Sequence, residues 1–114
     1  MLETKTVSEI INHIKSKDLS IKEVIEYYLN NIEKLNPKMN SIVSIKNKKE
    51  IIEDAEKKSN TKFCGLPSAV KDLSDVVGFP TTYGYPGTKN YNPKKNSLFV
   101  DKSVSYTHLT LPTT

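Results

Sequence analysis

The residues best suited to chemistry lie in one stretch of the sequence, residues 64–84. A short apolar run over residues 66–70 ends in Lys71 and Asp72, and a turn-rich segment follows over residues 78–84. A free lysine has a pKa of about 10.4 and is protonated at neutral pH, so it cannot accept a proton. Apolar surroundings disfavour the ammonium form and can make a lysine a base. Lys71 is therefore a candidate base if residues 66–70 form an interior strand.

Spacing alone does not separate Lys71 from the other lysines, most of which are expected to be solvated. Cys64 has no histidine nearby in sequence to activate it, so we interpret it as a buried, inert thiol. His13 lies at the margin of a helix stripe and is expected on the surface. Ser68 is expected to be a strand side chain, and Asp72 to bond backbone in the turn after the strand.

Composition narrows the class of protein. The 114 residues include 17 lysines, no arginine and 13 acidic residues, which gives a net charge of +4. Arginine dominates specific phosphate and base recognition, so its absence disfavours a nucleic-acid partner. No apolar run approaches the roughly 20 residues of a membrane span, and the polar start of the chain does not resemble a signal peptide. A single cysteine fits a reducing compartment, so we expect a cytoplasmic protein without membrane association.

Two amphipathic helices are predicted at the start of the chain. Each opens with a capping box, Thr6 with Glu9 and Ser20 with Glu23. Apolar residues then recur at helical spacing, and Asn36-Pro37 is expected to end the second helix. The first stripe is Val7, Ile10, Ile11 and Ile14, and the second is Ile21, Val24, Ile25, Tyr28, Leu29, Ile32 and Leu35.

The rest of the chain alternates short elements with turns. We predict a strand over residues 41–45, a charged helix over residues 47–59 and a strand over residues 66–70. The inward face of that helix is expected to be Ile51, Ile52 and Ala55. After the turns of residues 75–87, Asn96 is predicted to cap a helix that begins at Ser97.

Residues 103–114 differ from everything before them, because they contain no Lys, Asn, Ile, Asp or Glu. Residues 104–113 resemble the translation of one reading frame of a widely used transposon sequencing adapter. We therefore interpret residues 103–114 as a non-native tail, exclude them from the fold and give His108 no role. The alternative is a genuine Thr-rich terminus.

Residues 5–102 resemble the amino-terminal part of the amidase signature family, serine hydrolases that cleave carboxamides. The specific signs are Gly65-Leu66-Pro67, Lys71-Asp72 and Pro80-Thr81-Thr82-Tyr83-Gly84 at fixed offsets. Cys64 stands where a histidine is frequent, Tyr85 where a serine is common, and Lys94-Lys95-Asn96 where acidic residues are common. These departures put the substrate preference in doubt more than the reaction class.

The resemblance implies an α/β fold, of which residues 1–102 would supply outer helices and the first strands of a mixed sheet. It also implies that Lys71 is the base of a Ser-cisSer-Lys triad that hydrolyses an amide without a cofactor or metal. Both serines would lie further along, so the chain as given is expected to be an inactive piece. Thr82 and Tyr83 are candidates for contact with a small-molecule amide substrate, although Thr81-Thr82 is equally a hydrogen-bonded turn.

Two alternatives to a free-standing amidase remain. The A subunit of glutamyl-tRNA(Gln) amidotransferase belongs to the same family, but those chains usually have Asn after Lys-Asp, where this chain has Leu73. The other alternative is a non-catalytic helical interaction module, supported by the amphipathic helices over residues 6–35. Such a module gives no purpose to the Lys71 region.

Overall fold

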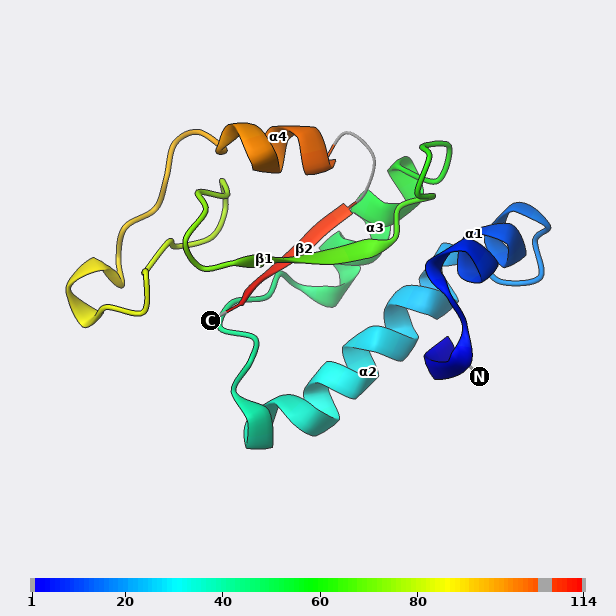
Figure 1. The fold of residues 1–114 in the computed structure, drawn as a ribbon, viewed down its shortest axis with the longest axis horizontal. Helices are drawn as coiled ribbons and strands as arrows, with labels where there is room; N and C mark the ends of the chain where they lie inside the picture. Colours follow the sequence, from blue (N-terminus) through cyan, green and yellow to red (C-terminus); the bar gives the residue numbers. More distant parts are fainter. Residues whose placement is uncertain (1, 105–107, 114) are drawn as a thin grey trace.

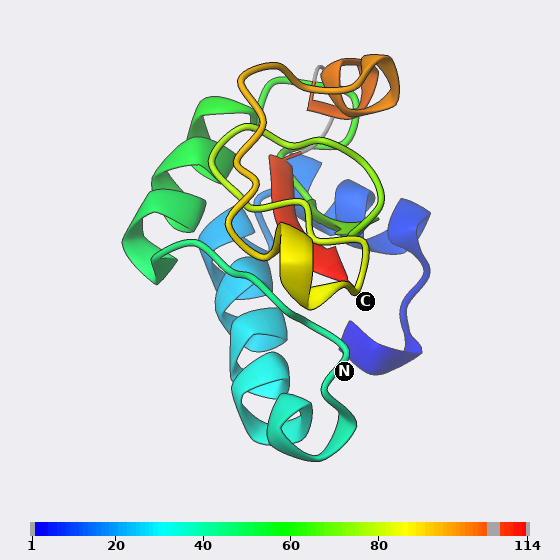
Figure 2. The same ribbon diagram turned by 90° about the vertical axis from the view of Figure 1, so that its left-hand side faces the viewer.

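The computed structural model describes residues 2–104 and 108–113. Two parallel strands lie between α4 on one side and α1 and α2 on the other, as both ribbon views show (Figures 1 and 2). No helix in the described part of the chain is both long and apolar enough to cross a membrane. The elements are η1 (Leu2–Thr4), α1 (Val7–Lys15), α2 (Ile21–Met39), α3 (Lys48–Lys57), β1 (Pro67–Lys71), η2 (Pro86–Thr88), α4 (Leu98–Val104) and β2 (His108–Thr113).

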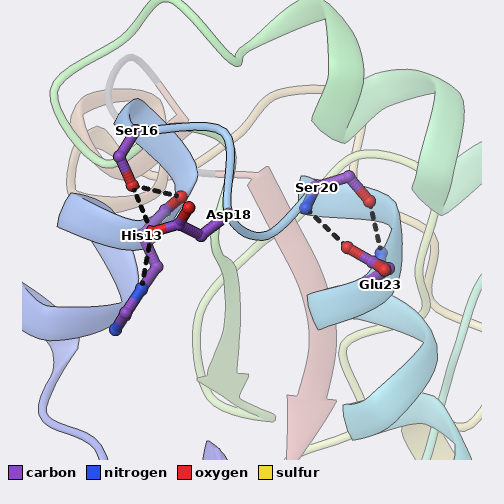
Figure 3. A network of polar contacts seen from close by, with 5 residues as sticks. All are labelled: His13, Ser16, Asp18, Ser20 and Glu23. Carbon is purple, nitrogen blue, oxygen red and sulfur yellow. Dashed lines mark hydrogen bonds and ion pairs between the residues drawn. The ribbon is translucent and has the colours of Figure 1, made fainter.

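Both predicted capping boxes are confirmed. At α1 the Glu9 amide donates to the Thr6 hydroxyl at 3.2 Å, and the Thr6 amide donates to the Glu9 carboxylate at 2.6 Å. At the start of α2 the Glu23 amide donates to the Ser20 hydroxyl at 3.1 Å, and the Ser20 amide donates to the Glu23 carboxylate at 2.8 Å (Figure 3). Each box satisfies free backbone amides of a first turn, so the sequence fixes where these helices begin.

The predicted end of α2 is wrong by one turn. Pro37 lies inside the helix, which continues to Met39. Pro37 has no backbone N–H and cannot donate to the carbonyl of Glu33 four residues earlier, yet the helix runs two residues beyond it. The helix ends instead at Asn40, whose backbone is left-handed (φ 51°) and whose amide donates to the carbonyl of Asn36 at 2.7 Å. Asparagine is among the few residues that tolerate this conformation.

The predicted strand over residues 41–45 does not form as a continuous strand, because only Ile42 makes an isolated β-bridge. The Asn36 side chain bonds the same residue: its amide group donates to the Ile42 carbonyl at 3.0 Å, and its oxygen accepts from the Ile42 amide at 2.9 Å. The amide and the carbonyl of Ile42 are thus bonded to a helix side chain. Val43 and Ile45 remain 44% and 48% exposed.

The charged helix is confirmed as α3, and its inward face is the predicted one. Ile51 and Ala55 are fully buried, and Ile52 packs against the same core at partial burial. The chain then returns across α3 at Gly65, which has φ +81°. A Cβ at this position would lie 2.3 Å from the carbonyl oxygen of Ala55. Only glycine allows this approach, which gives the Gly65 of the sequence motif a structural reason.

β1 confirms the strand predicted over residues 66–70, with its bounds one residue later. It pairs in parallel with β2, in a register that joins Pro67 to His108 and Lys71 to Thr113. Residues 108–113 lie beside β1 as β2, although we expected residues 103–114 to have no place in the fold. Our interpretation of the origin of this segment stays a prediction.

The described side chains form two separate cores. The helical core joins η1, α1, α2 and α3 and closes on the residue before β1. The second core is smaller and joins β1, the loop after it and α4. The buried members are Leu2, Ile10, Ile21, Val24, Ile25, Ile51, Ala55 and Leu66 in the helical core, and Val70, Val76, Phe79 and Val100 in the second core.

Candidate active site

Lys71 is the last residue of β1, and its side chain is exposed. Side chains alternate along a strand, so it shares a face with Ala69, which is also exposed, while Val70 points into the second core at 4% exposure. The chain turns at once, since the Ser74 amide donates to the Lys71 carbonyl at 3.1 Å. The apolar surroundings predicted for Lys71 are therefore absent from the described part of the chain, because one face of β1 is open.

Asp72 has a structural role, as predicted, but its partner lies ten residues later and not in the turn directly after β1. Its side chain is buried, with 4% exposed. One carboxylate oxygen accepts from the Thr82 amide at 2.8 Å, and the other accepts from the Thr82 hydroxyl. The backbone adds a third bond, because the Tyr83 amide donates to the Asp72 carbonyl at 3.1 Å. We call these three bonds the Asp72 clamp; they tie the carboxyl end of β1 to the loop ten residues later.

The two predicted substrate residues, Thr82 and Tyr83, are thereby brought next to the end of β1. The Thr82 hydroxyl also accepts from the Gly84 amide at 3.2 Å, so this segment is the hydrogen-bonded turn that the sequence allowed. Tyr83 has a left-handed backbone (φ 55°), and its side chain is 51% exposed. Contact of either residue with a substrate stays a prediction.

A second polar connection was missed from the sequence. The Val77 amide donates to the Asn96 side-chain oxygen at 2.7 Å, and the Ser97 amide donates to the Asp75 carbonyl at 3.0 Å. Asn96 therefore does not cap α4 as predicted. The helix begins at Leu98, and the Ser97 hydroxyl accepts from the Val100 amide at 3.4 Å. A short polar side chain can either cap a helix or bond the backbone of a loop, and the sequence does not distinguish the two.

Tyr91 meets Asp75 in the same region, with its hydroxyl 3.4 Å from one carboxylate oxygen. The negative charge of Asp75 raises the pKa of Tyr91, because it disfavours a phenolate beside it. The other carboxylate oxygen of Asp75 is buried and has no hydrogen-bond partner among the described residues. No signal in the sequence set Asp75 apart from the other acidic residues.

The remaining candidates take no part in this site. Cys64 is buried, with 2% exposed, as predicted. His13 is half-buried and lies 3.4 Å from Asp18 in the turn after α1 (Figure 3). The Ser16 hydroxyl, and after it His13, lowers the pKa of Asp18. The described residues contain no cluster of three His, Cys, Asp or Glu that could hold a metal ion.

Three surface cavities lie on the helical part and not at the end of β1. The two larger ones, of about 510 and 380 Å³, adjoin the segment that joins α2 to α3, and the third, of about 290 Å³, follows the last turns of α2. The third is lined mainly by apolar side chains, including Tyr28, Ile32, Leu35 and Met39. None of the three is lined by Lys71, Thr82 or Tyr83.

Comparison with known proteins identifies the family. The family model for amidases matches residues 23–103. The A subunit of glutamyl-tRNA(Gln) amidotransferase from Trichodesmium erythraeum is 32% identical, over 87% of this chain and 22% of that protein. An acylamidase from Rhodococcus erythropolis is 27% identical, over 85% of this chain and 22% of that protein. The chain thus spans about a fifth of the length of the curated relatives that it matches.

Solved structures agree. A bacterial aryl acylamidase of the amidase signature enzymes superposes with a TM-score of 0.79 and 26% identity, covering 96% of this chain and 25% of that chain. The A subunit of glutamyl-tRNA(Gln) amidotransferase from Thermotoga maritima gives a TM-score of 0.73 at 19% identity, covering 96% and 22%. That likeness concerns the fold alone. These matches confirm the predicted α/β class, and the chain belongs to the amidase family.

Proposed function

We propose that residues 1–102 are part of an amidase that hydrolyses the C–N bond of a small carboxamide, with Lys71 as the base of a Ser-cisSer-Lys triad. The observation that carries the proposal is the match over residues 23–103, which includes Lys71 at the carboxyl end of β1. The family resemblance assigns the base to this lysine. The Asp72 clamp holds the strand end that carries this lysine in place.

The chemistry requires a base because neither reactant is reactive alone. A serine hydroxyl is a poor nucleophile until a neighbouring group removes its proton. A neutral lysine would take a proton from the cis-serine, which in turn takes the proton of the nucleophilic serine. The same relay would later deliver a proton to the leaving amine. The open face of β1, with Ala69 and Lys71 exposed, leaves room for other parts of an amidase domain to cover the lysine. Such cover would favour the neutral amine, which a base requires.

Thr82 and Tyr83 complete the proposal as substrate contacts. Tyr83 has the better claim, because its ring is half exposed beside the strand end, whereas the Thr82 hydroxyl is already bonded to Asp72 and Gly84. The substrate is proposed to be a small molecule, without nucleic acid or membrane as partner. The single, buried cysteine supports a location in the reducing cytoplasm.

A second candidate function is that of the A subunit of a glutamyl-tRNA(Gln) amidotransferase, because several relatives carry that name. The acylamidase relative and Leu73 after Lys71-Asp72 favour the free-standing enzyme. The two are separated by assay: a free-standing amidase cleaves an aryl acylamide alone, whereas a subunit needs its partners to transfer an amide to glutamyl-tRNA.

The test of the base uses a protein of amidase length that contains residues 1–102. Lys71→Ala is expected to lower kcat for an aryl acylamide by at least about 10³-fold, since a base that activates the nucleophile is lost. Lys89→Ala is the matched control, because Lys89 is exposed and lies outside the clamp. Turnover by Lys71→Ala at the rate of the control would contradict the proposal.

A further inference from the structure

The carboxylate of Asp72 is buried in an unusual way. Its two oxygens accept from the amide and the hydroxyl of one residue, Thr82, and none of the ion pairs among the described residues includes it. A buried carboxylate needs charge-assisted hydrogen bonds to offset its lost hydration. The Thr82 bonds fill that need, so the carboxylate and the loop hold each other in place.

The clamp also holds a strained backbone. Tyr83 has φ 55°, a left-handed conformation that a tyrosine adopts only with strain. Its amide is bonded to the Asp72 carbonyl at 3.1 Å, and the Thr82 hydroxyl accepts from the Gly84 amide on the other side. Strain of this kind persists only where the surroundings determine the conformation, and it gathers at functional sites.

The clamp acts at the residue directly after Lys71. The Lys71 carbonyl accepts from the Ser74 amide at 3.1 Å, so the backbone on both sides of the Lys71–Asp72 bond is fixed. β1 is only five residues long, and the clamp adds to its pairing with β2 at this end. The side chain of Asp72 is itself too buried to meet a substrate, at 4% exposed, and both of its oxygens are in use.

We propose that Asp72 is a positioning residue for Lys71. Its hydrogen bonds to Thr82 hold the carboxyl end of β1, which carries Lys71, in place. This inference rests on the proposed function, in which Lys71 is the base. Proton transfer requires the base within hydrogen-bond reach of its partner. A misplacement of about 1 Å can lower a rate about 10²-fold. Loosening the clamp should therefore lower kcat far more than it raises KM.

The test uses the same amidase-length protein and two variants of one residue. Thr82→Val keeps the shape of the side chain and the hydrogen bond from the backbone amide to Asp72, but it removes the hydroxyl. We expect it to lower kcat per folded enzyme about tenfold and to change KM by less than about threefold. Thr82→Ser keeps the hydroxyl, so its kcat is expected to be clearly higher than that of Thr82→Val. Folded enzyme is counted from gel-filtration yield and circular dichroism.

Asp72→Ala is the stronger variant, with an expected loss in kcat of about 10²-fold. If it does not fold, Asp72→Asn replaces it, because the asparagine oxygen can still accept from the Thr82 amide. Equal losses in Thr82→Val and Thr82→Ser would overturn the inference. So would a fall in the amount of folded enzyme with kcat per folded molecule unchanged.

The same experiment separates this inference from the function on which it rests. If Lys71→Ala retains turnover, the proposed base is wrong, whatever the Thr82 variants do. If Lys71→Ala is inactive while Thr82→Val keeps the parental kcat, the base stands and the positioning role of Asp72 is wrong.

Discussion

Residues 2–66 and residues 67–104 are stabilised in different ways. The first region has three α-helices around eight buried side chains, with a capping box at the start of α1 and of α2. The second region has an apolar core of four buried side chains and depends on bonds from polar side chains to distant backbone, such as Asp72 to Thr82 and Asn96 to Val77. Packing along periodic helices supports the first region, and specific hydrogen bonds shape the second.

This difference explains where the candidate chemistry lies. Catalytic and binding residues tend to sit on loops that a rigid scaffold positions. Lys71, Asp72 and Thr82 all lie in the loop-rich region, next to a helical region that forms the larger core. Two kinds of substitution should therefore differ in their effect on stability. One disturbs packing against a helix, and the other disturbs the hydrogen bonds at a helix end.

The largest effect is expected where the two regions meet. Gly65→Ala should lower the free energy of unfolding by about 2–4 kcal/mol, because the new Cβ would clash with α3 backbone at 2.3 Å and adopt a left-handed φ of +81°. The measurement is urea unfolding followed by helical circular dichroism.

Gly84→Ala is the matched control for that variant. Gly84 has a similar φ of +70°, but a Cβ there would meet nothing within 4 Å. The control should therefore cost only the conformational strain, about 1–2 kcal/mol. Equal losses in the two variants would mean that the approach of Gly65 to α3 adds nothing to stability.

The smallest effect is expected at the start of α1, where a hydrogen bond from the Thr6 backbone lowers the pKa of Glu9. A lowered pKa in the folded state means that the unfolded chain binds more protons in the acid range. The contribution of Glu9 is therefore full above its unfolded pKa of about 4.3 and is lost as the pH falls through the lower folded value.

The measurement for Glu9 is the exchange protection of the Thr6 amide as a function of pH. Protection, corrected for intrinsic exchange, should fall in the parent chain as the pH drops below the unfolded pKa of about 4.3. Glu9→Gln keeps the capping box but does not titrate, so its protection should stay level over that range. The same fall in both chains would show that another group is responsible.

The sequence predicted the elements whose signals are local. The capping boxes located the starts of α1 and α2, and the spacing of Ile51, Ile52 and Ala55 identified the buried face of α3. The end of α2 was misplaced because the left-handed Asn40 ends the helix and Pro37 does not. Which of two nearby signals stops a helix depends on the contacts of the turn that follows.

Long-range contacts account for the other errors. Residues 41–45 have the composition of a strand, but the Asn36 side chain takes up the backbone groups of Ile42. Asn96 bonds Val77 in a distant loop and does not cap α4. At the site, the motif indicated Lys71 and Asp72, whereas the grip of Asp72 on Thr82 joins residues ten apart and became visible only in the fold.

The most direct test of the central claim, that an amine at position 71 is the base, is to remove the amine and return it chemically. In the amidase-length protein, Lys71→Cys is treated with 2-bromoethylamine, so that the thiolate displaces bromide and a lysine-like side chain ends again in an amine. Lys71→Ala, which retains the buried Cys64, receives the same treatment as control. We predict that Lys71→Cys is inactive before treatment and regains amide hydrolysis after it, while Lys71→Ala does not. Full activity of untreated Lys71→Cys, or no recovery after complete alkylation, would contradict the account.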